Sequence, residues 1–321
     1  MSVLVYLDQQ EGKIKKTALE ALGYGAAIGR QAGLPVAALL AGPVPKEELD
    51  RLGSFGAGKV LQATSEALQS FDGAVFAALV KEAAEKEKAT VIVFSHNFHG
   101  RAIAPQLSVL LQAGLVTGVV SLPDLSGGFT VKKSVFSGKA TARVSVLTPV
   151  KILTLSPNAF PLSPSGNPAP VENLEVSLPP SRVKVKSVQK ESGSIPLPEA
   201  EIIVSGGRGM KGPENWGMLE ELAQALGAAM ACSRPVADSG WRPHHEHVGQ
   251  TGLTVRPNLY IALGISGAIQ HLAGVNGSKV IVVINKDPEA PFFKAADYGM
   301  VGDIFQIVPA LTRAVKKLKG E

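Results

Sequence analysis

The stretch Glu201-Ile-Ile-Val-Ser-Gly-Gly-Arg-Gly-Met-Lys-Gly212 decides the fold of the second half of the chain. Its first four residues form a short apolar run typical of a strand, and the glycines that follow predict a turn into a helix over 215–226. Three of these glycines, Gly207, Gly209 and Gly212, have the spacing G-x-G-x-x-G. In that motif backbone N–H groups approach a pyrophosphate. A tight turn that binds no ligand stays open as an alternative.

A second glycine turn, residues 264–271, also follows an apolar run, residues 259–263. Ser266 is a good N-cap, so a helix is expected from about Ser266. Two such turns in one domain suit a dinucleotide that lies across several strand ends. The acidic residue expected about 20 positions after an NAD motif is missing, and Ser233-Arg234 stands near that place.

Further apolar runs complete a parallel α/β pattern in this half. Strands are expected at 228–231, 279–284 and 301–307, with Pro309 as the first residue of a closing helix over 310–319.

The first half alternates strands and helices in the same way, which indicates a parallel sheet. Strands are expected at 3–7, 36–40, 59–61 and 91–94, and helices at 15–31, 76–88 and 101–111. Three runs without helices between them, 129–136, 140–147 and 150–155, predict an antiparallel extension of that sheet.

Prolines crowd residues 157–180, which excludes a helix or an inner strand there. We expect a linker or a wrapping segment, which gains order by lying on a partner, followed by an edge strand at 183–188. The fold class is therefore α/β, with an N-terminal domain over 1–190, a Pro-rich linker region over 157–198 and a C-terminal Rossmann-like domain over 196–321.

Composition excludes several classes of protein. Of 321 residues, 45% are hydrophobic and 18% charged, which rules out disorder. The net charge of +5 comes from scattered basic residues, so no nucleic-acid partner is expected. The chain has one cysteine, lacks a positively charged signal region and has no run of about 18 apolar residues. We expect a cytoplasmic protein that does not insert into membranes.

Three other features invite a functional interpretation. The run His244-His245-Glu246-His247 resembles a metal site in composition, but its spacing does not place ligands on one helical face, and a solvated loop is the expected reading. The run 96–101 could bind an anion, but capping of the following helix is favoured. Cys232, at a strand end, is expected to be buried and inert.

Five stretches carry a resemblance to a known family: 204–209, 233–234, 248–252, 263–274 and 284–291. In order and spacing they resemble the alpha subunit of electron transfer flavoprotein. The resemblance is strong over 201–321 and looser over 1–190. It implies that the first domain packs on a beta subunit and that the second holds one FAD per heterodimer. Any AMP is expected in the beta subunit.

The resemblance also implies roles for individual residues. Ser233 and Arg234 look like flavin-side groups, residues 248–251 like contacts to the flavin edge, and His271 like a contact to a flavin carbonyl. Contacts to the AMP half of the FAD molecule are expected from Asn285, Asp303 and Ile304. The cofactor-binding set is Gly207, Arg208, Gly209, Ser233, Arg234, Val248, Gly249, Gln250, Thr251, Ser266, Gly267, Ala268, Ile269, Gln270, His271, Asn285, Asp303 and Ile304. The loop containing His247 departs from the family, which puts a role for that side chain in doubt.

The function implied is electron carriage rather than catalysis, with no catalytic residue. Electrons would come from dehydrogenases such as the acyl-CoA dehydrogenases of fatty acid beta-oxidation and pass to a membrane quinone oxidoreductase. A fixed cation lowers the free energy of a negatively charged flavin semiquinone, and Arg234 with a protonated His271 could supply that charge.

Two rival functions remain. An NADP-linked oxidoreductase would use the first glycine turn for the pyrophosphate and Arg234 for the 2′-phosphate. An adenine-nucleotide sensor would bind ATP or AMP in the first half alone.

Overall fold

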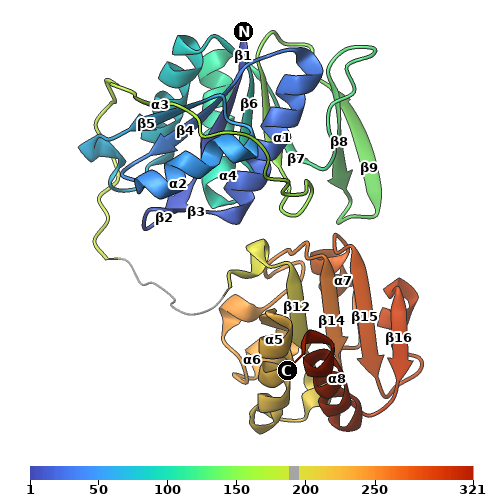
Figure 1. The fold of residues 1–321 in the computed structure, drawn as a ribbon. Coiled ribbons are helices and arrows are strands. Elements are labelled where there is room, and N and C mark those ends of the chain that lie inside the picture. The colour runs from blue at the N-terminus through green and yellow to red at the C-terminus, as the bar shows by residue number, and fades with distance from the viewer. Residues whose placement is uncertain (188–194, 321) are drawn as a thin grey trace. The chain divides into compact units, whose positions relative to one another are not determined.

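The computed structural model describes residues 1–187 and 195–320, which form two compact units (Figure 1). Unit 1 contains residues 1–135 and the described residues from Thr141 to the undescribed stretch 188–194. Unit 2 contains Phe136–Ala140 and the described residues after that stretch. Each unit is described by itself below.

Unit 1 is built on a nine-stranded sheet with the order β11-β5-β4-β1-β6-β10-β7-β8-β9. Its strands are β1 (Ser2–Leu7), β4 (Val36–Ala41), β5 (Lys59–Ala63), β6 (Ala89–Ser95), β7 (Gly114–Val119), β8 (Thr130–Val135), β9 (Ala140–Ser145), β10 (Lys151–Leu155) and β11 (Val171–Asn173). A small separate ribbon joins β2 (Gln9–Gln10) and β3 (Lys13–Ile14).

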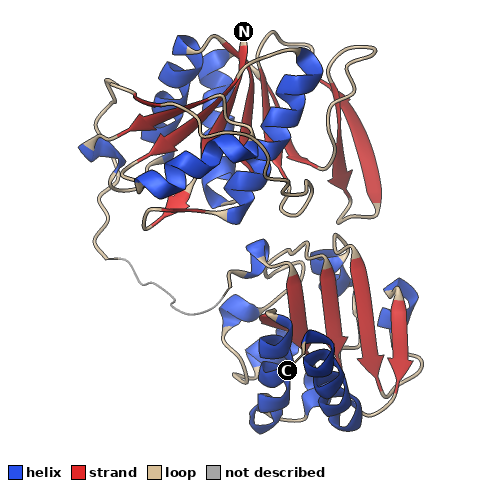
Figure 2. Ribbon diagram, viewed as in Figure 1, coloured by secondary structure: helices blue, strands red, loops and turns tan. Residues whose placement is uncertain are grey.

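Helices cover both faces of this sheet (Figure 2). They are α1 (Lys16–Ala32), α2 (Lys46–Asp50), α3 (Gly73–Lys86) and α4 (Phe98–Leu111), with short turns η1 (Arg51–Phe55) and η2 (Glu66–Leu68). Helix α1 packs on one face, and α3 and α4 pack on the other. Every residue of β1 and β4 is buried, as expected for central parallel strands that are covered on both sides.

The expected antiparallel extension is confirmed for one hairpin and wrong for the third run. Strand β8 pairs antiparallel with β7, and β9 lies next to β8 at the edge of the sheet. Strand β10 instead pairs parallel with both β6 and β7. Its continuous apolar run is buried on both faces, which is the pattern of an inner parallel strand.

The proline-rich stretch after residue 157 lies partly on unit 1 itself. The ring of Phe160 packs edge-on against Tyr24 at 5.7 Å, and β11 adds to the sheet edge by pairing with β5. These residues therefore wrap onto unit 1, and contact of the segment with a partner stays a prediction. The edge strand expected at 183–188 is also absent from residues 183–187, and residue 188 lies outside the described residues.

Unit 2 is built on a parallel five-stranded sheet with the order β13-β12-β14-β15-β16. The strands are β12 (Ile202–Gly206), β13 (Ala229–Cys232), β14 (Leu259–Leu263), β15 (Val280–Asn285) and β16 (Tyr298–Val301). The helices and turns are η3 (Leu197–Glu199), η4 (Arg208–Met210), η5 (Pro213–Asn215), α5 (Gly217–Leu226), α6 (Arg234–Asp238), η6 (His244–Glu246), α7 (Ile269–Val275), η7 (Pro291–Ala295) and α8 (Ile304–Lys319). Helices α5 and α8 cover one face, and α7 with η7 covers the other.

Three expected boundaries in unit 2 are wrong. The last strand is Tyr298–Val301 rather than 301–307, because the Asp303 carboxylate accepts the Phe305 N–H and starts α8 at Ile304. Pro309 therefore lies inside α8 instead of opening it. Helix α7 begins at Ile269, after Ala268, so Ser266 is not its N-cap.

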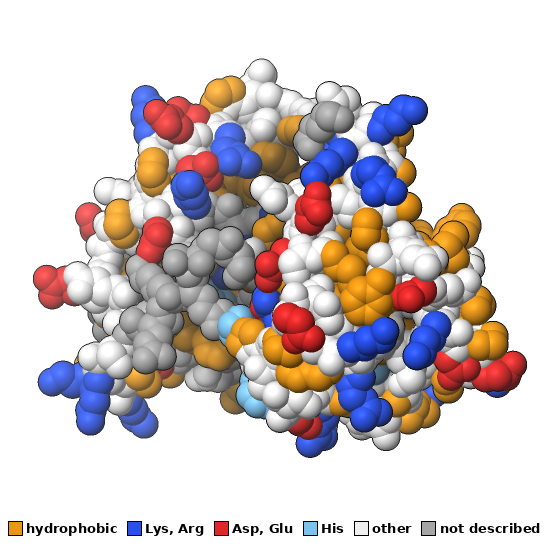
Figure 3. Space-filling model, turned by 90° about the horizontal axis from the view of Figure 1, so that it is seen from below, with side chains coloured by type: hydrophobic (Ala, Val, Ile, Leu, Met, Phe, Trp, Pro, Cys, Tyr) orange, Lys and Arg blue, Asp and Glu red, His pale blue; other side chains and the backbone are white. Residues whose placement is uncertain are grey.

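No helix in the described ranges is both long and apolar enough to span a membrane. On the face seen in Figure 3, Lys and Arg side chains lie among Asp and Glu side chains rather than in one basic patch.

Candidate functional site

Unit 2 contains a cleft at the carboxyl ends of its parallel strands, with a volume of about 490 Å³. This is where parallel α/β sheets bind ligands. Its lining brings together most of the residues predicted from the sequence: Arg208, Gly209, Ser233, Arg234, Val248, Gly249, Gln250, Thr251, Ser266, Ala268, Gln270, His271 and Asn285. The lining also contains Pro235, His247, Gly264, Ile265 and Asp287, which were not in the predicted set.

The two glycine turns form the floor of this cleft by packing backbone on backbone. The N–H of Gly207 donates to the Leu263 carbonyl at 2.9 Å, and the N–H of Gly209 donates to the Gly264 carbonyl at 3.0 Å. A Cβ on Gly209 would lie 2.6 Å from the Cα of Gly264. Glycine is required here because the turns touch each other.

This geometry limits how the first turn could act as a phosphate loop, and that role stays a prediction. The N–H groups of Gly207 and Gly209 are already bonded, so neither is available to a pyrophosphate. The turn also runs through η4 and η5 before α5 begins, so it does not open a long helix directly. The turn shapes the floor, and Gly209 and the exposed Arg208 line the cleft.

Residues Val248–Thr251 form one wall of the cleft. The Val248 N–H donates to the Cys232 carbonyl at 3.1 Å, and the Gln250 N–H donates to the Gln270 carbonyl at 2.7 Å. Gly249 has φ +155° and lies against the backbone of Gln270, where a side chain would be strained. The wall is therefore fixed to β13 at one end and to the start of α7 at the other, while Gln250 and Thr251 stay exposed.

Positive charge at the cleft comes from two arginines. Arg208 is exposed, and the side chain of Arg234 is 62% exposed with its Nε 3.3 Å from the Asp238 carboxylate. The Asp238 carboxylate offsets part of the positive charge of Arg234.

His271 lies in the first turn of α7 and is 7% exposed. Its Nε2 is 2.9 Å from the Tyr260 hydroxyl, and its Nδ1 is buried without a hydrogen bond in the described part of the chain. Burial lowers the pKa of His271 to about 4, assisted by the nearby His247 and opposed by the backbone of Val248. The ring is therefore neutral near pH 7 in the chain without a cofactor, and protonation of His271 beside a negatively charged flavin stays a prediction.

His247 is 8% exposed and lines the cleft, although it was not in the predicted set. Its ring packs beside Gly249 and Gly252, and its backbone pairs with Cys232 in a short parallel bridge. The solvated-loop interpretation holds for the exposed His244 and His245 but is wrong for His247. The signal that could have included it is its position directly before Val248.

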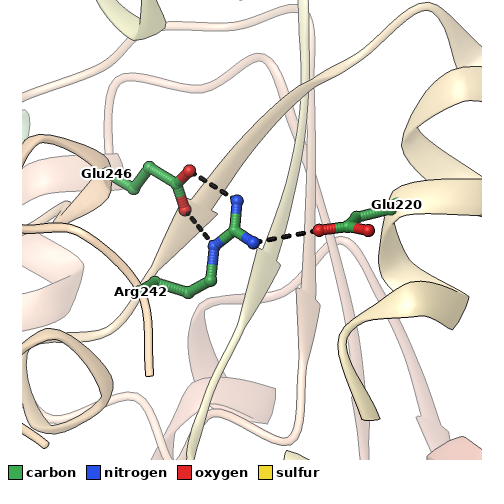
Figure 4. Close-up of polar contacts among 3 residues, drawn as sticks. All are labelled: Glu220, Arg242 and Glu246. Atoms are coloured by element: carbon green, nitrogen blue, oxygen red, sulfur yellow. Dashed lines mark hydrogen bonds and ion pairs between the residues drawn. The ribbon is translucent and has the colours of Figure 1, made fainter. Parts of the chain in front are cut away.

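Arg242 anchors the loop that carries His247 (Figure 4). Its guanidinium makes two hydrogen bonds to Glu246, at 2.6 and 2.7 Å, and a third to Glu220 of α5 at 2.9 Å. The same group lies over the Trp216 ring at 5.2 Å. We call Arg242, Glu246 and Glu220 the arginine clamp. It ties the loop before the cleft wall to the helix layer of unit 2.

The remaining predicted residues lie outside the cleft lining. Gly207 packs under the floor, and Gly267, with φ +82°, lies against Phe292. Ile269 is exposed outside the cleft. Asp303 caps α8, and Ile304 is buried in the core. Asn285 does line the cleft, and its Nδ2 donates to the Ile265 carbonyl. Contacts from Asp303 or Ile304 to a cofactor stay predictions.

A metal cluster and a reactive cysteine are the two other kinds of site that the sequence brings into question. Within the described residues no three His, Cys, Asp or Glu side chains gather as metal ligands do. Cys232 is buried and free, and burial raises the pKa of its thiol to about 12, as expected for an inert cysteine.

In unit 1, the strand ends where a nucleotide would bind are occupied by a polar pair. Asn97 caps α4 by accepting the Gly100 N–H, which confirms the capping expectation, and its Nδ2 donates to the buried carboxylate of Asp8 at 2.7 Å. The Asp8 carboxylate also lies 3.9 Å from the Lys15 ammonium, so this pair brings no net positive charge to the strand ends. The geometry therefore gives no support to an adenine-nucleotide sensor in unit 1.

Comparison with known proteins decides the family. The sequence pattern of the electron transfer flavoprotein domain matches residues 3–179, and that of the electron transfer flavoprotein FAD-binding domain matches residues 196–276. The chain belongs to the electron transfer flavoprotein alpha-subunit family. It is 38% identical to electron transfer flavoprotein subunit alpha of Bacillus subtilis, with 98% of each chain covered. It is 37% identical to that subunit of Thermoanaerobacterium thermosaccharolyticum, with 99% and 98% covered.

The match extends to a eukaryotic relative. The chain is 41% identical to the mitochondrial alpha subunit of Dictyostelium discoideum over 73% of this chain and 68% of the relative. These relatives confirm the family suggested by the sequence motifs, an α/β fold and a role in electron transfer.

The residues of the cleft fit the FAD of this family. Its volume suits part of an extended ligand, its floor has no room for a Cβ at Gly209, and the two arginines match the negative charge of a pyrophosphate and of a reduced ring. The flavin, when bound, supplies the redox chemistry. The electron transfer flavoprotein chain supplies the floor, the Val248–Thr251 wall and the positive charge.

Proposed function

We propose that the chain is one half of a heterodimeric electron carrier, in which a single FAD lies in the unit 2 cleft and a beta subunit completes the site. The observation that carries this proposal is the openness of the cleft rim. Gln250, Thr251, Ser266 and Gln270 line the cleft and are exposed, as is most of Arg234. A cofactor held there would remain accessible on one side to a second protein.

Strand β16 supports a protein partner for unit 2. It lies at the edge of the sheet, and its apolar side chains are exposed: Tyr298 by 68%, Met300 by 53% and Val301 by 57%. An exposed apolar edge strand is a liability for an isolated protein, and a partner commonly covers such a strand. We propose the beta subunit as that partner and place any AMP in it.

The carrier role rests on what the cleft residues can do. Two arginines attract negative charge, and the neutral His271 is held by Tyr260 inside the protein. Such residues bind a flavin and adjust its potential, while the flavin exchanges the electrons. We propose that acyl-CoA dehydrogenases and related dehydrogenases donate those electrons and that a quinone oxidoreductase accepts them. A cytoplasmic location goes with this proposal.

A coupled assay tests the carrier role. The chain, co-purified with its beta subunit, is mixed with acyl-CoA and a catalytic amount of acyl-CoA dehydrogenase, and the flavin absorbance at about 450 nm is followed. The band should bleach only when the dehydrogenase is present and recover on addition of quinone oxidoreductase and quinone. Bleaching by NADPH alone would support the NADP-linked rival instead.

A further inference from the structure

The two histidines that line the cleft differ in how water can reach them. The Nε2 of His271 is held by Tyr260, and its Nδ1 is sealed from solvent. The ring of His247 makes no side-chain hydrogen bond in the described part of the chain, and neither of its two nitrogens is fully buried. Water can therefore exchange a proton with His247 but not with His271 as it stands.

The position of His247 places a titratable ring inside the cleft wall. The ring lies under the Val248–Gly252 turn, and a Cβ on Gly249 would come within 3.3 Å of its Nε2. A Cβ on Gly252 would come within 2.8 Å of its Nδ1. The glycines on both sides leave room for this imidazole, and the arginine clamp holds the loop that carries it.

The charged groups around His247 come from three elements. Asp238 and Arg234 face it from α6, His244 from its own loop, and His271 from α7. Burial lowers the pKa of His247, and Arg234 and His244 act in the same direction, while Asp238 raises it. The ring is therefore neutral at pH 7 when no further negative charge is near, and a new negative charge in the cleft would favour its protonation.

We propose that His247 is the redox-linked proton acceptor of this cleft: it takes up a proton from water when the bound cofactor becomes negatively charged. This inference rests on the proposed function, because it needs a flavin in the cleft.

The step balances without a further reactant. An electron enters the cofactor from the donor protein, and a proton from water binds the ring nitrogen of His247 that carries no hydrogen in the neutral imidazole. On oxidation the electron leaves and the proton returns to water. Linkage is reciprocal. If reduction of the cofactor strengthens proton binding to His247 by some factor, protonation of His247 favours reduction by the same factor.

The test measures proton affinity and potential, not turnover. In the heterodimer with ¹³C-labelled histidine, the His247 signal is titrated by NMR in the oxidised and the reduced state. We expect its proton affinity to rise about tenfold on reduction. In a parallel potentiometric titration between pH 5.5 and 8.5, the midpoint potential should fall as pH rises, and His247→Gln should flatten this dependence.

The matched control is His245→Gln, which removes an exposed histidine from the same loop. It should keep the pH dependence of the wild type. An equal His247 titration in both redox states, or an unchanged slope in His247→Gln with full FAD content, would overturn the inference. Failure of the wild-type heterodimer to bind FAD would instead overturn the proposed function.

Discussion

The N–H of Gly209 donates to the carbonyl oxygen of Gly264 at 3.0 Å, and a Cβ on Gly209 would lie 2.6 Å from the Cα of Gly264. These residues follow β12 and β14, which are neighbours in the sheet. The floor of the cleft is thus a contact between two backbones, and its shape depends on the absence of side chains.

Gly209→Ala should destabilise unit 2 because the added methyl group must displace backbone atoms. Overpacking of this kind costs about 1–3 kcal/mol. Urea unfolding followed by circular dichroism measures the loss. The control is Gly217→Ala at the start of α5, where a Cβ meets nothing within 4 Å and should leave stability equal or higher by up to about 1 kcal/mol. Equal effects of the two substitutions would contradict the packing account.

Loss of the arginine clamp should loosen the cleft wall. Arg242→Met leaves Glu246 and Glu220 without their partner, and hydrogen bonds to charged groups contribute about 1.5–3 kcal/mol each at most. We expect faster dissociation of FAD from the heterodimer, measured by recovery of flavin fluorescence on dilution. Glu221→Gln breaks only the exposed ion pair with Lys316 and should change the rate little. An unchanged rate of FAD dissociation in Arg242→Met would contradict this role for the clamp.

Arg234→Ala should lower the midpoint potential of the flavin while FAD stays largely bound. The guanidinium is more than half exposed, so solvent weakens its effect on the flavin. We therefore expect a shift of a few tens of millivolts. For one electron, about 59 mV corresponds to a tenfold change in the equilibrium constant of reduction. Spectroelectrochemistry of the heterodimer measures the shift. The control is Lys317→Ala in the last turn of α8. Loss of FAD with an unchanged potential would show that Arg234 binds the pyrophosphate instead. The stabilised semiquinone stays a prediction that the same titration tests.

Acid should destabilise unit 2 through His271. Burial lowers its pKa in the folded chain to about 4, below the usual value of about 6.5 in the unfolded chain. The unfolded chain therefore binds the proton first, and the free energy of unfolding should fall as pH drops from 6.5 towards 4. At 1.36 kcal/mol per pKa unit, this contributes up to about 2 kcal/mol between pH 7 and 5.

Chemical unfolding at the two pH values checks this contribution. Burial lowers the pKa of His96 and His99 in unit 1 to about 4 as well, so His271→Gln should lose only its own part of the pH dependence. His244→Gln, which replaces an exposed histidine, should retain all of it. A pH dependence that is identical in both variants would rule out His271 as its source.

The sequence predicted the repeating parts of the fold well. Apolar runs such as those of β1, β4 and β14 determine buried parallel strands because both faces of each strand must be covered. The placement of β10 could not be read in this way, since its apolar run fits either strand direction and its partners β6 and β7 come earlier in the chain. The boundary of α8 was missed because the Asp303 cap, and not the apolar pattern, determines where the helix starts.

The candidate site was predicted largely through its motifs. Residues of the two glycine turns and of the Val248–Thr251 wall do converge on one cleft. The roles of individual groups depended on tertiary contacts that spacing does not reveal. The N–H groups of Gly207 and Gly209 are used between the turns, Tyr260 binds His271, and the clamp places His247 in the wall. Each of these contacts joins residues whose proximity arises only from folding.

The ratio of flavin to protein in the purified heterodimer tests the central claim most directly. The chain is co-expressed with its beta subunit, and FAD released by denaturation is counted against both polypeptides. We predict one FAD per heterodimer, little FAD on the chain expressed alone, and loss of FAD in Ser266→Trp, which fills the cleft lined by Ser266. A heterodimer without FAD, or a Ser266→Trp variant that keeps its full flavin content, would contradict the assignment of this cleft as the FAD site.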